Sequence, residues 1–148
     1  VSCNHFRDEG LDALAQHLGL ARQTKVRSLS MSDNAWAARR PPPGGTDGAA
    51  RGADVERNPM HAFCEQLSTN RSLTSLDLSG SQIDPCAAVI LEASLVSHAS
   101  LRRLVLDHNP VGVLGLRSVV RLVADERSKL NMVSARDVQV GAGYCEPE

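Results

Sequence analysis

Aromatic residues are scarce in this sequence. They make up 3% of its 148 residues, whereas hydrophobic residues together make up 42%. The chain has the length of one compact domain, so its core must be built from leucine, valine, isoleucine and alanine. Few tyrosine or tryptophan side chains are left to anchor a tight protein interface.

The sequence has neither a long hydrophobic run nor an excess of one charge. Its longest uninterrupted apolar run, 87–91, is far shorter than the roughly 18 residues that a membrane-spanning helix requires. The 16 basic and 17 acidic residues give a formal net charge of −1. These features predict neither a membrane nor a nucleic-acid partner. No signal-peptide pattern opens the sequence. We expect a cytoplasmic, intracellular protein, because its cysteines show neither a disulfide framework nor a zinc-binding arrangement.

The sequence has four cysteines but no closely spaced pair of them. Cys3, Cys64, Cys86 and Cys145 lie far apart, whereas zinc ligands are clustered and small disulfide-stabilised domains have a denser set of cysteines. We therefore expect reduced, mostly buried thiols, and no metal or other cofactor.

What the sequence does contain is a repeat. Its clearest unit reads LxxLxLxxNxV over residues 101–111, and related patterns occupy 26–36, 73–83 and 130–140. The last three units are offset by 28 and 29 residues, and a fragment of an earlier unit precedes Gly10. Self-similarity at this period is typical of a solenoid, in which stacked units share one core.

Apolar residues at helical spacing, with polar residues between them, follow the early fragment and the units at 26–36, 73–83 and 101–111, but not the last unit. These residues are Leu11, Leu14, Ala15 and Leu18; Met60, Phe63 and Leu67; Ala87, Ala88, Leu91 and Leu95; and Leu116, Val119, Val120 and Val123. Pro85 stands where a helix can begin. Short strands and helices are therefore predicted to alternate along the chain.

This pattern resembles the leucine-rich repeat family, in its longer, ribonuclease-inhibitor-like class. The resemblance implies an α/β solenoid with a horseshoe shape, parallel strands on its concave face and helices on its convex face. It implies that residues 1–148 form a single domain of about four units plus a partial first unit. Because both ends lack part of a unit, we expect a fragment of a longer array.

In that family an asparagine satisfies backbone groups at the turn that follows each strand. Asn34 and Asn109 match this position. Ser81 can supply part of the bonding, and Val138 can supply none. Trp36 takes an inward position two residues after Asn34, where we expect core packing.

The spacing between the first two full units is 47 residues, which indicates an insertion. Residues 37–57 contain three consecutive prolines and several glycines without a large apolar cluster, so we expect a disordered loop. The alternative is a polyproline recognition segment at 39–43.

The alternation of side chains along a strand predicts which residues leave the core. Leu104 and Leu106 point inward, so the side chains between them point out of the concave face. The residues that we predict to contact a partner are Asp33, Asp77, Arg103, Val105, Asp107, His108, Arg136 and Asp137.

These features predict a monomeric scaffold that binds another protein, not an enzyme. The sequence has no GxSxG, GxxxxGKS/T, GxGxxG or HExxH pattern, and no nucleophile is recognisably placed beside the adjacent Asp107 and His108. One alternative is a GTPase-activating regulator resembling the Ran GTPase-activating protein, although no residue can be carried over. Another is a structural spacer in a larger protein.

Overall fold

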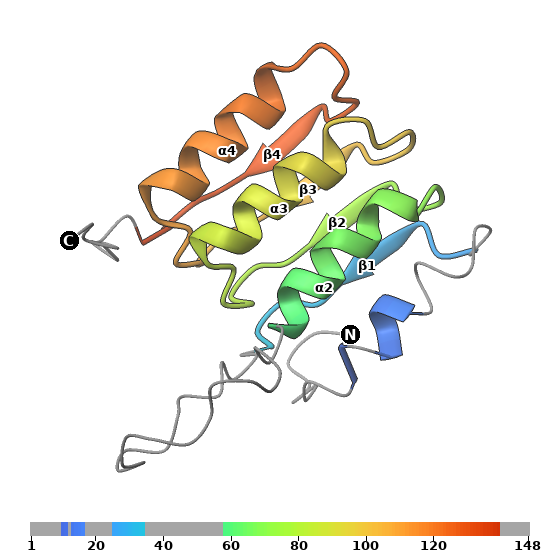
Figure 1. Cartoon of the computed structure of the whole chain (residues 1–148), viewed down its shortest axis with the longest axis horizontal. Helices are drawn as coiled ribbons and strands as arrows, with labels where there is room; N and C mark the ends of the chain where they lie inside the picture. The colour runs from blue at the N-terminus through green and yellow to red at the C-terminus, as the bar shows by residue number, and fades with distance from the viewer. Residues whose placement is uncertain (1–9, 12, 17–24, 35–57, 140–148) are drawn as a thin grey trace, which may run out of the picture.

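The computed structural model describes residues 10–11, 13–16, 25–34 and 58–139 (Figure 1). Within these ranges the elements are β1 (Ser28–Ser30), α2 (Pro59–Gln66), the 3₁₀ helix η1 (Leu67–Thr69), β2 (Ser75–Asp77), α3 (Pro85–Leu95), β3 (Arg103–Val105), α4 (Gly112–Ala124) and β4 (Met132–Ser134). The predictions for the insertion at 37–57, for Trp36 and for the fragment before Gly10 fall outside the described residues.

The strands form one parallel sheet in the order β1-β2-β3-β4. Their register places the same repeat position side by side, so Leu29 pairs with Leu76, Leu76 with Leu104, and Leu104 with Val133. The 47-residue spacing before β2 leaves this register unchanged, because the additional residues lie between β1 and α2. The predicted α/β architecture with a parallel sheet is therefore confirmed.

Two helices begin at a proline that follows a capping side chain. Asn58 Oδ1 accepts the N–H of Met60 at 2.9 Å before α2, and Asp84 Oδ1 accepts the N–H of Ala87 at 2.6 Å before α3. Proline at the first helical position costs no hydrogen bond, because an N–H there would have no partner within the helix. Local sequence chemistry thus fixes where these helices start.

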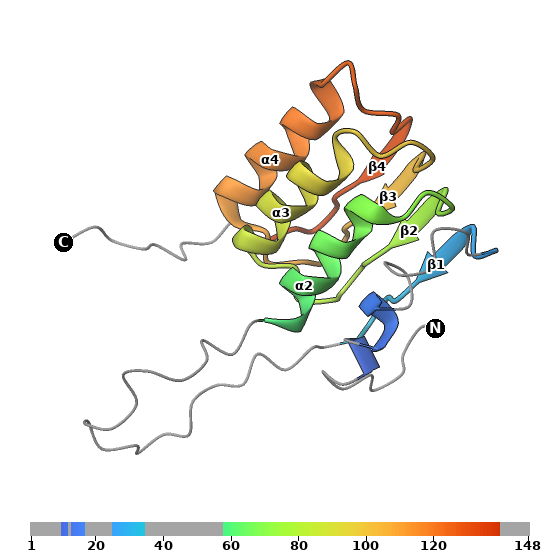
Figure 2. The same ribbon diagram turned by 45° about the vertical axis from the view of Figure 1, so that its right-hand side comes forward.

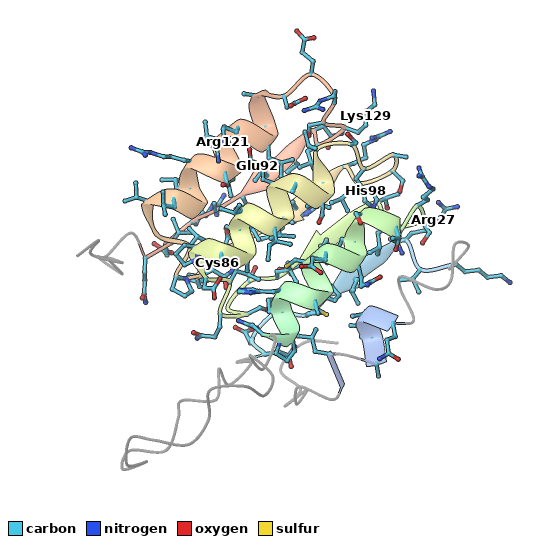
Figure 3. The ribbon with its side chains drawn as sticks, in the orientation of Figure 1. Arg27, Cys86, Glu92, His98, Arg121 and Lys129 are labelled. Atoms are coloured by element: carbon cyan, nitrogen blue, oxygen red, sulfur yellow. The ribbon has the colours of Figure 1, made fainter. Side chains whose placement is uncertain are left out.

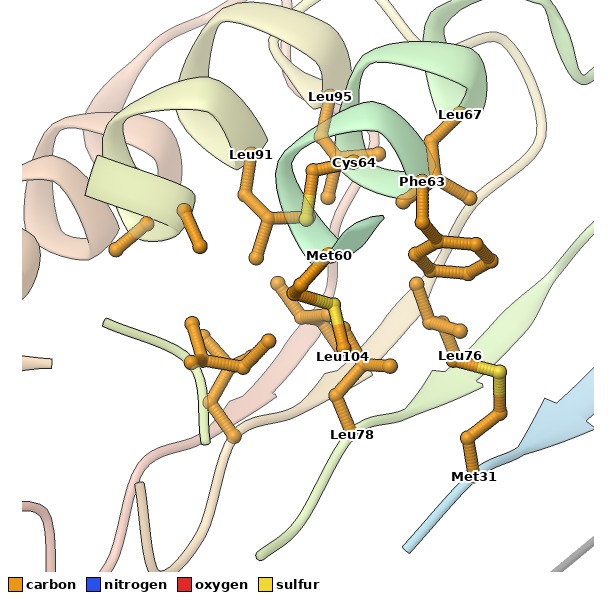
Figure 4. Close-up of a cluster of buried hydrophobic side chains, with 14 of the residues drawn as sticks. Met31, Met60, Phe63, Cys64, Leu67, Leu76, Leu78, Leu91, Leu95 and Leu104 are labelled. Atoms are coloured by element: carbon orange, nitrogen blue, oxygen red, sulfur yellow. The ribbon is translucent and has the colours of Figure 1, made fainter. Parts of the chain in front are cut away.

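The helices lie together on one side of the sheet (Figure 2). Figure 4 shows Phe63 and Leu91 above Leu76 and Leu104, with Cys64 within the same cluster. All five side chains are at most 1% exposed. Burial of each large apolar side chain stabilises the fold by about 2 kcal/mol, so the shared core is what holds neighbouring units together.

Three apolar side chains that follow the repeat pattern are exposed. Val120 and Val123 on α4 are 60% and 53% exposed, because α4 is the last helix of the described chain and has a described neighbour on one side only. Val26, at the first position of its unit, is 42% exposed, whereas Leu73 and Leu101 at the same position are buried. Periodicity therefore located the helices, but of the four apolar residues that it predicted to face inward on α4 only Val119 is buried, and it missed the buried Leu122.

Candidate protein-interaction surface

The face of the sheet turned away from the helices carries mainly polar side chains. We call it the open face and define it by Ser28, Ser30, Ser32, Ser75, Asp77, Ser79, Arg103, Val105, Asp107, Met132, Ser134 and Arg136. The parallel register brings these residues from four strands into adjacent rows about 5 Å apart. A partner would meet them as one surface.

On the β1–β2 side of the open face, hydrogen bonds fix the carboxylate of Asp77. Its Oδ1 accepts the N–H of Ser79 at 3.0 Å and the hydroxyl of Ser79 at 2.6 Å, and its Oδ2 accepts the hydroxyl of Ser30 at 3.2 Å. The bond from Ser30 crosses from one unit to the next. The negative charge is therefore held in one place, and little side-chain entropy would be lost on binding.

On the β3–β4 side, Asp107 is fixed in a similar way. Its Oδ1 accepts the hydroxyl of Ser134 at 2.7 Å and the backbone N–H of Arg136 at 2.8 Å. Partial desolvation raises the pKa of Asp107, but the hydrogen bonds from Arg136 and Ser134 outweigh it and bring that pKa below its usual value. Asp107 is thus a charged acceptor at neutral pH.

The rim beside the open face carries Asp33, His108 and Asp137. All three have a positive φ, at 58°, 57° and 50°, and Gly80 holds the same repeat position with φ 60°. Aspartate and histidine tolerate this left-handed conformation better than bulky residues do. Nδ1 of His108 lies 3.7 Å from Oδ2 of Asp137, and both side chains are mostly exposed.

Val105 differs from the sequence prediction. It lies in the row of the open face between Asp77 and Ser134, but it is only 8% exposed. Val105 lies on an inner strand, where Asp77 and Ser134 flank it on both sides, so it offers little surface. Arg103 and Met132 in the next row are exposed, Met132 to 45%. Met132 therefore offers a partner more apolar surface than Val105 does.

The turns that follow the strands are held by the asparagine position. Asn109 Nδ2 donates to the carbonyls of Leu78, Leu106 and Asp107 at 2.8, 3.0 and 3.1 Å. Ser81, at the same position one unit earlier, donates to the carbonyl of Met31 at 2.9 Å.

Asn34 closes the equivalent turn of the first described unit. Its Nδ2 donates to the carbonyls of Met31 and Ser32 at 2.9 and 3.3 Å. These buried bonds lock the backbone behind the open face and so fix the position of the rim residues.

A second set of turn-forming residues, which the repeat pattern did not reveal, lies in the segments that lead into the strands. Asn70 Oδ1 accepts the N–H groups of Ser72 and Leu73, both at 2.9 Å. His98, 28 residues later, does the same through Nδ1, with Leu101 N at 3.0 Å. The recurrence of a polar residue followed two and three positions later by serine and leucine was the available signal.

The described part of the chain shows neither a metal site nor a membrane-spanning helix. No described group of three or more His, Cys, Asp and Glu side chains could hold a metal ion. None of the described helices is long and apolar enough to cross a membrane. A shallow groove between α3 and α4 is lined in part by Glu92 and Arg121, which form a two-bond ion pair with N···O distances of 2.9 Å (Figure 3).

Comparison with known proteins agrees with this architecture. A sequence model of the family described as Leucine Rich repeat matches residues 1–15 and 69–85. A search of curated proteins finds no match. The structure is similar to leiomodin-1 actin-binding site 2, with a TM-score of 0.64 and 13% sequence identity, over 89% of this chain.

The chain spans 66% of the length of that leiomodin-1 structure. At this low identity the likeness concerns the fold alone. Both short family matches carry the apolar spacing of the repeat, and the four strands lie in one repeat register. Together these findings support the identification of the chain as a leucine-rich repeat protein.

Proposed function

We propose that this chain is a protein-interaction module that binds another protein through the open face of its sheet. The observation that carries the proposal is the fixed arrangement of two carboxylates: Asp77 is held by Ser79 of its own unit and Ser30 of the preceding unit, and Asp107 by Ser134 and Arg136 of the following unit. Exposed Arg103 and Arg136 stand in the rows on either side of Val105. A surface with fixed hydrogen-bond acceptors and exposed cations fits a protein partner with charged groups of both signs.

The proposal includes the finer features that the repeat implies. The array belongs to the ribonuclease-inhibitor-like class, the open face is the concave side of a horseshoe, and the chain acts in the cytoplasm as a monomer without catalytic activity. The leiomodin-1 structure is named for actin binding, so actin is the first purified partner to test.

The decisive experiment compares the wild-type chain with the Arg103→Glu/Arg136→Glu variant in pull-downs from cell lysate, followed by mass spectrometry. Arg117→Glu is the control, because Arg117 is exposed on α4 and lies away from the open face. Circular dichroism first establishes that all three proteins fold. Binding of purified actin is measured in parallel.

A partner that wild type and the Arg117→Glu control retain, and that the double variant loses, supports the open face. Equal retention by all three proteins contradicts it and favours the spacer alternative. Increased GTP turnover by a retained GTPase would instead favour the regulator alternative.

A further inference from the structure

Charge is segregated between the two ends of the strands, although the whole chain is nearly neutral. The segments that lead into the strands (25–27, 67–74, 96–102 and 125–131) contain six basic and two acidic residues. The segments that follow the strands (31–34, 78–84, 106–111 and 135–139) contain four aspartates and one arginine. The net charge of the sequence conceals this difference.

We call the first group the basic edge and define it by Lys25, Arg27, Arg71, Arg102, Arg127 and Lys129, all of them exposed. Figure 3 shows Arg27 and Lys129 on the same side of the molecule, with Cys86 at the start of α3 on the opposite side. Among the edge residues, Arg127 binds Asp125 through N···O distances of 2.8 and 3.0 Å. The remaining acidic residue of these segments, Glu126, cannot balance the other five cations.

The repeat positions two of these guanidinium groups. Arg27 and Arg102 occupy the same position in their units, immediately before a strand. Arg27 Nη1 donates to the carbonyl of Ser72 at 3.5 Å, and Arg102 Nη1 donates to the carbonyl of Lys129 at 3.2 Å. In both cases the side chain reaches along the edge to the following unit. Each guanidinium has further N–H groups with which it can bind a carboxylate.

We infer that the basic edge binds an extended acidic segment of a partner protein. Four strands spaced about 4.8 Å apart give the edge a length of about 14 Å, which four or five extended residues would span. Four of the six cations are arginines, whose planar guanidinium matches a carboxylate with two parallel hydrogen bonds. The charge and the length of the edge thus fit a short run of aspartate or glutamate.

A nucleic acid would fit this edge less well. Proteins that bind single strands stack the bases on aromatic side chains, and the four segments of the basic edge contain no phenylalanine, tyrosine or tryptophan. Phosphates would find positive charge there but no platform for the bases.

The test is fluorescence anisotropy with the full chain and a labelled peptide of about six glutamates, which exceeds the length of the edge. Variant Arg102→Glu and control Arg117→Glu change the charge equally, one on the edge and one on α4. The double variant Arg27→Glu/Arg102→Glu extends the series. Because either reversal could disturb folding, Arg27→Gln/Arg102→Gln provides a variant that keeps a hydrogen-bond donor and removes the charge.

We expect affinity for the peptide to fall by about threefold in Arg102→Glu and about tenfold in the double variant, and to stay at the wild-type level in Arg117→Glu. Raising the salt from about 50 to about 300 mM should weaken wild-type binding. No binding of the peptide, or equal binding by all variants, overturns the inference. Tighter binding of a single-stranded oligonucleotide at the same salt also overturns it. The open-face proposal is tested on Arg103 and Arg136, so either idea can fail alone.

Discussion

Asn109 and Ser81 occupy the same position in neighbouring repeats, and a hydrogen bond joins them: the backbone N–H of Ser81 donates to Asn109 Oδ1 at 3.0 Å. The same oxygen accepts the N–H of Ile83 at 3.0 Å. One buried side chain therefore closes the turn of its own unit and ties down the turn of the unit before it. Through this contact the stability of each of the two units depends on the other unit.

Replacing Asn109 should destabilise the chain strongly. Asn109→Ala leaves several buried backbone groups without partners, so we expect the free energy of unfolding to fall by roughly 3 kcal/mol. Asn109→Ser copies Ser81, which keeps one donor, and should cost about half as much. Urea unfolding followed by circular dichroism measures both. Equal losses in the two variants would show that the hydrogen bonds of the amide are not the cause.

His98 should make stability depend on pH. Its Nδ1 accepts the N–H of Leu101, which requires the neutral ring, and burial lowers the pKa of His98 below its ordinary value of 6.5. His98 of the unfolded chain therefore binds a proton more readily than His98 of the folded chain. The stability that neutral His98 contributes is fully present above pH 6.5 and is lost as the pH falls below that value.

The matched variant for this effect is His98→Asn, since Asn70 makes the equivalent bonds without titrating. Urea unfolding at a series of pH values from about 8 to about 5 should show a smaller decrease in stability for the variant than for wild type. Superimposable pH profiles of the two proteins would rule out His98 as the source.

Helix α4 should tolerate no side chain at Gly115. A Cβ there would lie 2.9 Å from Cβ of Ala88 on α3 and 3.0 Å from Cβ of Val111. Gly115→Ala should therefore lower the free energy of unfolding by about 1 to 2 kcal/mol, although alanine favours a helix. In the Ala88→Gly background the same change should cost at least about 0.5 kcal/mol less. Additive effects in this double-mutant cycle would mean that the two positions do not compete for space.

The two cysteines in the described residues should react very differently. Burial raises the pKa of the Cys64 thiol far above its usual range, whereas Cys86 is exposed at the start of α3. We expect iodoacetamide to alkylate Cys86 at least about a hundredfold faster than Cys64 in the native protein. Mass spectrometry of tryptic peptides gives both rates, and urea should remove the difference. Similar native rates would show that the core around Cys64 opens readily.

The repeat pattern in the sequence predicted much of this fold, because the same spacing recurs in several units. Leu76 and Leu104 are buried in register as the alternation of the strand requires, and α3 begins where Pro85 indicated. The positions of the rim residues Asp33, His108 and Asp137 also follow from the repeat, since each stands one residue before the asparagine position.

The sequence by itself therefore determined the units, their period and the inward residues of the strands, because these depend on contacts that each unit makes with an equivalent neighbour. Only the tertiary structure decided which side chains meet across strands. Asp107 binds Ser134, 27 residues away, and Val105 is covered although its position is outward. Such contacts depend on the rotamers and sizes of side chains that register brings together, and a repeat pattern specifies neither.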